Sequence, residues 1–164
     1  MEHLNTSSTE EEKIWQLLET VCDPEIPVLT IIDLGIVRDV KYESGVANIT
    51  ITPTYSGCPA MDAISIDIRF KLIEHGFTNI KITSVLSPAW TTDWMSENGK
   101  RKLNAYGIAP PRLVADGITS VNILQCPQCH STNTKLISQF GSTACKALYQ
   151  CNDCKEPFDY FKCH

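Results

Sequence analysis

Four cysteines near the end of the sequence have the spacing of a metal site. They form two C-x-x-C pairs, Cys126 with Cys129 and Cys151 with Cys154, and 21 residues separate the pairs. Two residues between paired cysteines allow one tight turn to direct both sulfurs at the same ion. Four thiolates then complete a tetrahedral shell, a donor set that favours zinc over iron. The spacing therefore predicts a zinc ribbon, with a short hairpin between the pairs.

Three further side chains that can bind metal lie in the same part of the chain. Cys145 precedes Cys151 by six residues, and Cys163 is followed directly by His164. These groups could complete an alternative ligand set, or they could form a second, transient thiol site beside the first. Two C-x-x-C pairs already satisfy one zinc ion, which makes the smaller shell the simpler expectation.

Cys58 is the candidate reactive thiol of the preceding part of the chain. If Pro59 is the first helical residue, Cys58 is the N-cap, where unsatisfied backbone amides and the helix dipole favour a thiolate. Such a thiolate could hold iron or a cluster, or it could attack an electrophile. The alternative is a small buried apolar side chain, which is the commoner role of a single cysteine.

Three carboxylates, Asp23, Glu25 and Asp33, flank an extended, linker-like stretch over residues 23–35. They could bind metal, support neighbouring ligands or cap turns, and turn formation is the commoner use of such residues. The sequence has no Ser-His-Asp order, no phosphate-binding glycine loop and only four histidines. We therefore expect no catalytic constellation, and the chain is not predicted to be an enzyme.

The elements that would position these groups form an α+β fold. An apolar stripe predicts a helix that ends before Pro24, and β-rich runs over residues 36–42 and 46–52 predict a hairpin. A second helix over residues 59–75 and a strand over residues 80–86 follow. This order predicts a small α/β domain with a mixed sheet and its helices largely on one face.

The domain boundaries follow from composition. We expect an α/β domain over residues 1–107, a linker over residues 108–124 that contains Pro110 and Pro111, and the zinc ribbon over residues 125–164. We find no internal repeat in the sequence.

Two apolar features of the first domain have alternative explanations. The helix over residues 59–75 is apolar on two faces, so it is either deeply packed or covered by a partner. Trp90 and Trp94 could anchor the core, which is the commoner role, or they could form a docking patch.

Composition and charge limit the class of protein. Of the 164 residues 43% are hydrophobic and 20% are charged, and no apolar run is long enough to span a membrane. The polar start, Met1–Glu12, predicts no secretory signal, and eight cysteines in such a chain predict a reducing cytoplasm. Residues 1–125 carry 10 basic and 16 acidic groups, and residues 126–164 carry four and three. Neither part has the positive excess that nucleic-acid binding normally requires.

Three short strings resemble the small α/β domain of iron–sulfur assembly factors: DPEIPV over residues 23–28, DLGIV over residues 33–37 and GCP over residues 57–59. In that family, a cysteine at the position of Cys58 is thought to engage iron or a cluster in transit, with the acids of the Asp-Pro-Glu segment close to it. The resemblance implies a transfer site of Cys58, Asp23 and Glu25.

Longer strings, over residues 15–164, are similar to the D subunits of bacterial phenylacetyl-CoA epoxidase systems: ITPTYSGCPAMDAI, VLSPAWTTDWMSE, YGIAPP, FGSTACKALYQCNDC and EPFDYFKCH. The resemblance implies an accessory or maturation factor of a multicomponent monooxygenase in aerobic phenylacetate catabolism. Its partners would be the oxygenase, which holds the catalytic diiron site, or the iron–sulfur flavoprotein reductase.

Two functions fit these observations. In the first, Cys58 carries iron or an iron–sulfur cluster to an oxygenase or reductase subunit, together with a second thiol or a homodimer mate. In the second, the chain is a non-catalytic scaffold that binds only a structural zinc, and the two-faced helix with Trp90 and Trp94 contacts other subunits. A DNA-binding ribbon is disfavoured by the charge.

Overall fold

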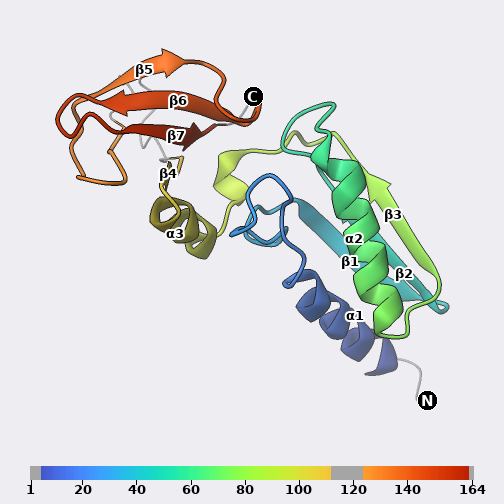
Figure 1. The fold of residues 1–164 in the computed structure, drawn as a ribbon. Coiled ribbons are helices and arrows are strands. Elements are labelled where there is room, and N and C mark those ends of the chain that lie inside the picture. The colour runs from blue at the N-terminus through green and yellow to red at the C-terminus, as the bar shows by residue number, and fades with distance from the viewer. Residues whose placement is uncertain (1–4, 112–123, 163–164) are drawn as a thin grey trace. The chain divides into compact units, whose positions relative to one another are not determined.

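The computed structural model describes residues 5–111 and 124–162 (Figure 1). The chain divides into two compact units, Met1–Ser96 and Glu97–His164. Within the described residues, no helix is both long enough and apolar enough to cross a membrane.

The first unit is built on a three-stranded mixed sheet. Its elements are α1 (Asn5–Leu18), β1 (Val37–Glu43), β2 (Val46–Ile51), α2 (Ala60–Glu74), β3 (Ile80–Ser84) and the 3-10 turn η1 (Thr92–Trp94). Strand β2 lies in the centre, antiparallel to β1 and parallel to β3. The predicted order of helix, hairpin, helix and strand is confirmed.

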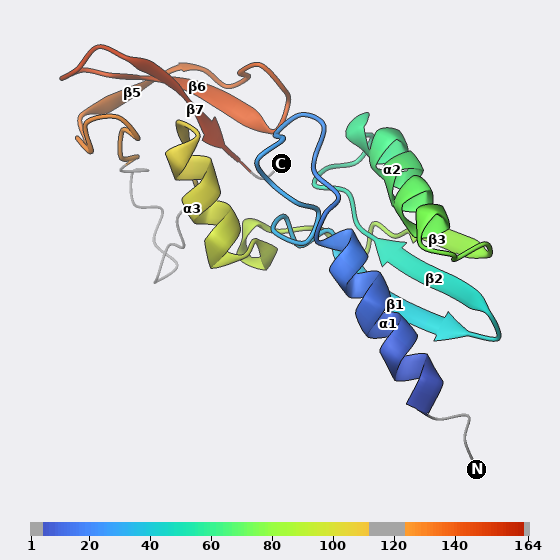
Figure 2. The ribbon, with the colours of Figure 1, turned by 60° about the horizontal axis from the view of Figure 1, so that its bottom comes forward.

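Both helices of the first unit pack on one face of its sheet, α1 beside β1 and α2 beside β3 (Figure 2). The alternation in β2 turns Ala47, Ile49 and Ile51 to this face, where they are buried. The helices supply a second layer of buried aliphatic side chains: Ile14 and Leu18 from α1, and Ile64, Ile68 and Leu72 from α2.

The stretch between α1 and β1 has little regular structure, but it belongs to the core. Ile26, Leu29, Ile31 and Leu34 are each no more than 2% exposed. An isolated antiparallel bridge between Cys22 and Thr30 closes the loop on itself. The expectation of a linker-like segment here was therefore wrong, because its apolar residues supply part of the core.

The second unit is a four-stranded sheet preceded by a helix. Its elements are α3 (Glu97–Ala105), β4 (Ile108–Ala109), β5 (Thr134–Ser138), β6 (Lys146–Cys151) and β7 (Pro157–Phe161). The strand order is β4-β7-β6-β5, with antiparallel pairing except between β4 and β7.

The second unit begins earlier in the chain than the sequence predicted. Strand β4 lies inside the expected linker, yet it pairs with β7. The remaining part of that linker is mostly outside the described residues. Ala109 is buried in a cluster with Leu124, Cys126, Cys151 and Phe158, so packing groups this strand with the ribbon rather than with a connecting segment.

Candidate metal centre and Cys58

The four cysteines of the two C-x-x-C pairs converge in the second unit. Their Sγ atoms all lie within 4.8 Å of one another. The Sγ atoms of Cys126 and Cys154 are 3.7 Å apart, and those of Cys129 and Cys151 are 3.5 Å apart. A tetrahedral zinc ion with Zn–S bonds of about 2.3 Å requires sulfurs about 3.8 Å apart. The donor set and its spacing therefore fit one zinc ion.

The two cysteine pairs lie in two copies of one backbone structure. In the first copy, the Cys126 amide donates to the Ser131 carbonyl at 2.8 Å, and in the second the Cys151 amide donates to the Glu156 carbonyl at 3.0 Å. Both bonds join the first cysteine of a pair to the residue five positions later. Each pair is thus held in a closed turn of the same size.

A glutamine before each pair makes the repeat complete. Gln125 Nε2 donates to the His130 carbonyl at 2.9 Å, and Gln150 Nε2 donates to the Lys155 carbonyl at 3.0 Å. His130 and Lys155 have positive φ angles of 62° and 69°. The expectation of no internal repeat was wrong, because a Gln-Cys-x-x-Cys pattern occurs twice and builds the same loop twice.

The carboxylate of Asp153 joins the two loops. It accepts hydrogen bonds from the Ser131 hydroxyl and, at 2.9 Å, from Asn133 Nδ2. These two donors lower the pKa of Asp153 below its usual value. Asn133 also accepts from the Asn152 side chain at 2.9 Å. Side chains following the first cysteine pair therefore hold the turn of the second pair in place.

The clustered thiols differ in acidity. The backbone amide of Cys154 is the main group that lowers the pKa of Cys151 to about 7. At Cys154 the backbone amide of Glu156 lowers the pKa, but desolvation and the neighbouring thiols outweigh it and raise the value to about 12. A divalent cation would bind all four groups as thiolates, so its binding releases protons.

The additional donors near the ribbon are not part of this group. Cys145 is buried, and its Sγ lies 3.1 Å from the Thr143 hydroxyl. It does not belong to the four-thiol cluster. Cys163 and His164, the other two expected candidates, lie outside the described residues.

Cys58 lies by itself before α2. The helix begins at Ala60, with Pro59 as the cap residue at φ −70° and ψ −20°. Cys58 is therefore one residue further from the helix than predicted, although its carbonyl already accepts the Met61 amide at 3.3 Å. Its side chain is half-buried, and Gly57 before it has a φ of +79° with open space around it.

The carboxylates near the start of the chain form turns. Asp23 is 9% exposed, and its Oδ1 accepts the amides of Glu25 at 2.7 Å and Ile26 at 2.8 Å. Asp33 Oδ1 accepts the Ser96 hydroxyl at 2.8 Å. These are the capping roles that the sequence left open as the commoner alternative.

Among residues 5–111 and 124–162, the ribbon thiols are the only group of three or more His, Cys, Asp or Glu side chains close enough to share one ion. Cys58, Asp23 and Glu25 do not form such a group in the chain by itself.

The two tryptophans anchor the core loop. Trp90 is 3% exposed, and its indole N–H donates to the Leu34 carbonyl at 2.8 Å. The Arg38 guanidinium lies 3.5 Å from the centre of the Trp94 ring. Gly35, at φ +69°, lies against the Trp94 backbone, where an added Cβ would be 2.1 Å from the carbonyl oxygen. The docking-patch alternative for the two tryptophans was wrong, because the loop of residues 19–36 covers Trp90.

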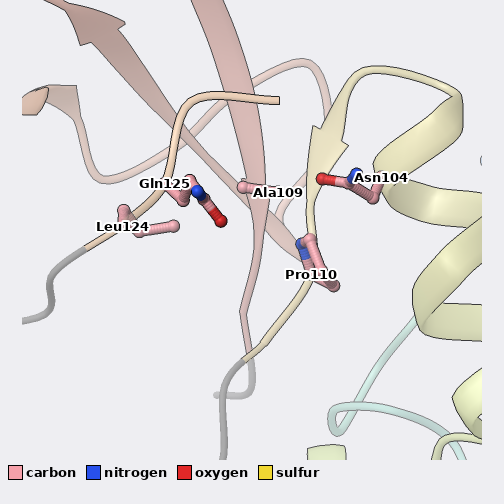
Figure 3. A pocket seen from close by; sticks show the side chains of 5 residues that line it. All are labelled: Asn104, Ala109, Pro110, Leu124 and Gln125. Atoms are coloured by element: carbon pink, nitrogen blue, oxygen red, sulfur yellow. The ribbon is translucent and has the colours of Figure 1, made fainter. Parts of the chain in front are cut away.

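A small pocket in the second unit offers no titratable group (Figure 3). It is lined by Asn104, Ala109, Pro110, Leu124 and Gln125. Its Gln125 side chain already bonds to the first cysteine loop, so this pocket adds nothing to a catalytic site.

Comparisons with known proteins define the class. Residues 11–75 match the family model described as an iron–sulfur cluster assembly protein, and residues 114–162 match the model of the PaaD zinc beta ribbon domain. The chain thus joins an iron–sulfur cluster assembly domain to a zinc ribbon. It is 51% identical, over 92% of each chain, to the D subunit of the Escherichia coli protein named "Putative 1,2-phenylacetyl-CoA epoxidase". The chain belongs to this family of phenylacetyl-CoA epoxidase D subunits.

Two further comparisons concern the first unit. The chain is 40% identical over 95 residues to a Porphyromonas gingivalis protein named Fe-S protein maturation auxiliary factor, covering 57% of this chain and 90% of that protein. The solved structure of a domain of unknown function, DUF59, from Bacillus anthracis matches with a TM-score of 0.57 and 33% identity. That match covers 60% of this chain and 94% of the solved one.

Proposed function

We propose that the chain is an accessory maturation factor of a phenylacetyl-CoA epoxidase system and has no catalytic reaction of its own. In this proposal it acts in the cytoplasm and helps to deliver iron or an iron–sulfur cluster to the oxygenase or to the iron–sulfur flavoprotein reductase. Cys58 carries the cargo. Support comes from the names of the relatives and from the assembly-protein match over residues 11–75, which includes Cys58.

The observation that carries the proposal is the setting of Cys58. Its thiol is half-buried at the start of a helix and is not part of a ready ligand cluster. One thiolate leaves most coordination positions of an iron ion or cluster open to an acceptor protein or a second copy of this chain. Exchange of ligands can then move the cargo, because the carrier holds it by few bonds. Asp23 and Glu25 are second candidates for this site through the family pattern.

The ribbon thiols have a different role in the proposal. Cys126, Cys129, Cys151 and Cys154 would hold one zinc ion, whose chemistry is to neutralise four thiolates and join the two loops. The shell is closed, so the zinc is structural. The residues around it position the thiols and do not pass on the cargo.

The test is metal and sulfide analysis of anaerobically purified protein. The wild type should hold one zinc per chain together with iron, and Cys58→Ser should keep the zinc and lose the iron. Cys22→Ser is the matched control, because Cys22 is another cysteine of the first unit and is exposed. Iron retained by Cys58→Ser at the wild-type level would contradict the transfer role.

A second candidate function is a scaffold that binds only zinc. It is favoured by one observation: α2 exposes Ile66, Phe70 and Ile73, an apolar surface that could contact other subunits. In this case the isolated protein contains no iron in any variant, and it purifies as a stable complex with epoxidase subunits.

A further inference from the structure

Helix α2 has an apolar face that is not used in the first unit. Ile66, Phe70 and Ile73 are 53%, 64% and 55% exposed. The opposite face of the same helix buries Ile64, Ile68 and Leu72 against the sheet. The sequence left open whether two apolar faces meant deep packing or a partner, and the packing uses only one of them.

The three exposed side chains form one stripe. They lie at positions i, i+4 and i+7, which share a side of an α-helix and span about 10 Å along its axis. This ridge matches the grooves of a second helix with apolar residues at the same spacing. A helix of two to three turns is long enough to cover it.

Acidic side chains border the stripe. Asp62, Asp67 and Glu74 are all exposed on α2 beside the apolar residues. The basic groups of the helix are engaged elsewhere: Arg69 Nη1 donates to the Ile80 carbonyl at 3.0 Å, and Lys71 pairs with Glu74 at 4.0 Å. The edge of the stripe is therefore negative.

The charge of the whole first unit has the same sign. Residues 1–96 carry 14 acidic and six basic groups, which gives a net charge of −8. Two copies of this unit would repel each other, with acids facing acids along the paired helices. A partner segment with Lys or Arg beside its apolar residues would be attracted and would pair with the acidic border.

We propose that the stripe of Ile66, Phe70 and Ile73 is the docking surface for a basic amphipathic helix of a partner protein. The partner places apolar side chains at i, i+3 or i+4 and i+7 on the stripe and basic side chains beside Asp67 and Glu74. The inference is independent of Cys58 and of the cargo proposed for it.

The test uses a defined probe, a synthetic Leu/Lys amphipathic peptide of about five helical turns. Its binding to the zinc-loaded full chain is measured by fluorescence anisotropy. Phe70→Ser should weaken binding at least about tenfold, because a central aromatic contact dominates such interfaces. Phe140→Ser is the matched control, since Phe140 is 60% exposed in the second unit, and it should bind as the wild type does.

The charges are tested in parallel. A peptide with Glu in place of Lys should bind at least about tenfold more weakly than the Leu/Lys peptide. Asp67→Asn with Glu74→Gln should weaken binding of the Leu/Lys peptide and reduce its salt dependence.

Two outcomes would overturn the proposal. Equal binding by wild type, Phe70→Ser and Phe140→Ser would place the peptide elsewhere. A dimer of the wild type that Phe70→Ser converts to a monomer would show a second copy as the occupant. Cys58→Ser should bind the peptide normally and Phe70→Ser should keep its iron, so failure here and failure of the cargo proposal can be distinguished.

Discussion

The two units of the chain hold their folds together by different means. The first unit buries aliphatic side chains from two helices, a three-stranded sheet and the loop of residues 19–36. The second unit has a smaller apolar cluster and adds hydrogen bonds between two cysteine loops. A small module buries too little apolar surface to be stable alone, so a metal must supply much of its folding free energy.

The cysteines of the two units show the same contrast. Cys126 has three other thiols within reach, whereas Cys58 has no such group around it in the described chain. The residue type is identical, but the number of neighbouring donors differs. A closed group of donors suits a permanent ion, and a single donor suits a passing one.

Loss of zinc should have the largest effect, and it should affect one unit alone. Chelation, or Cys126→Ser, is expected to unfold the ribbon, because structural zinc contributes about 10–16 kcal/mol in small zinc modules. In a ¹H–¹⁵N NMR spectrum, signals of residues 124–162 should collapse while those of the first unit remain dispersed. A ribbon that stays folded with chelator would contradict the proposed division.

The reverse experiment disrupts the first unit and leaves the metal. Gly35→Ala should lower the free energy of unfolding of that unit by about 3 kcal/mol or more, because the added Cβ meets the Trp94 carbonyl at 2.1 Å and φ is +69°. Urea unfolding followed by tryptophan fluorescence measures this loss, and zinc content should not change.

The control for this variant is Gly45→Ala. Gly45 also has a positive φ, +78°, but it has open space around it. The expected loss is only about 1–2 kcal/mol. Equal losses at the two positions would mean that contact with Trp94 is unimportant.

The bridge between the cysteine loops should have an intermediate effect. Asp153→Ala removes the acceptor for Ser131 and Asn133, and zinc affinity should fall about 10- to 100-fold, as it does when partners of ligand loops are lost. Competition with a chromophoric chelator measures the affinity. Glu156→Ala removes a nearby exposed carboxylate and should change little.

The smallest effect tests the repeat itself. Gln125→Ala and Gln150→Ala each remove one hydrogen bond to a loop carbonyl, and each should cost about 0.5–1.5 kcal/mol of ribbon stability. Thermal unfolding of the zinc-loaded protein measures both. A large loss at one position and none at the other would show that the two loops are not equivalent.

The metal centre was predictable because its geometry is local. The C-x-x-C spacing fixes which sulfurs one turn can aim at an ion, whatever the surrounding fold is. The Gln-Cys-x-x-Cys repeat was also visible in the sequence, but its meaning depends on a hydrogen bond across five residues that spacing alone does not reveal.

Other features were decided by tertiary packing. The sequence could not say which apolar face of α2 would be buried, since Ile64 and Ile66 are chemically the same and differ only in the side they occupy. Strand β4 is two residues long, and only its pairing with β7 makes it a strand. Trp90 became a core residue through a bond to Leu34, which is 56 positions away.

The pairing of β4 with β7 bears on the order in which the chain matures during synthesis. Ile108 is paired with Asp159, so α3 and β4 leave the ribosome well before their sheet can exist. The first unit, by contrast, has all its residues once Ser96 has emerged. Domains generally fold in the order of their synthesis. The nascent protein therefore has a folded first unit, with Cys58 in place, while the ribbon still awaits both its last strand and its ion.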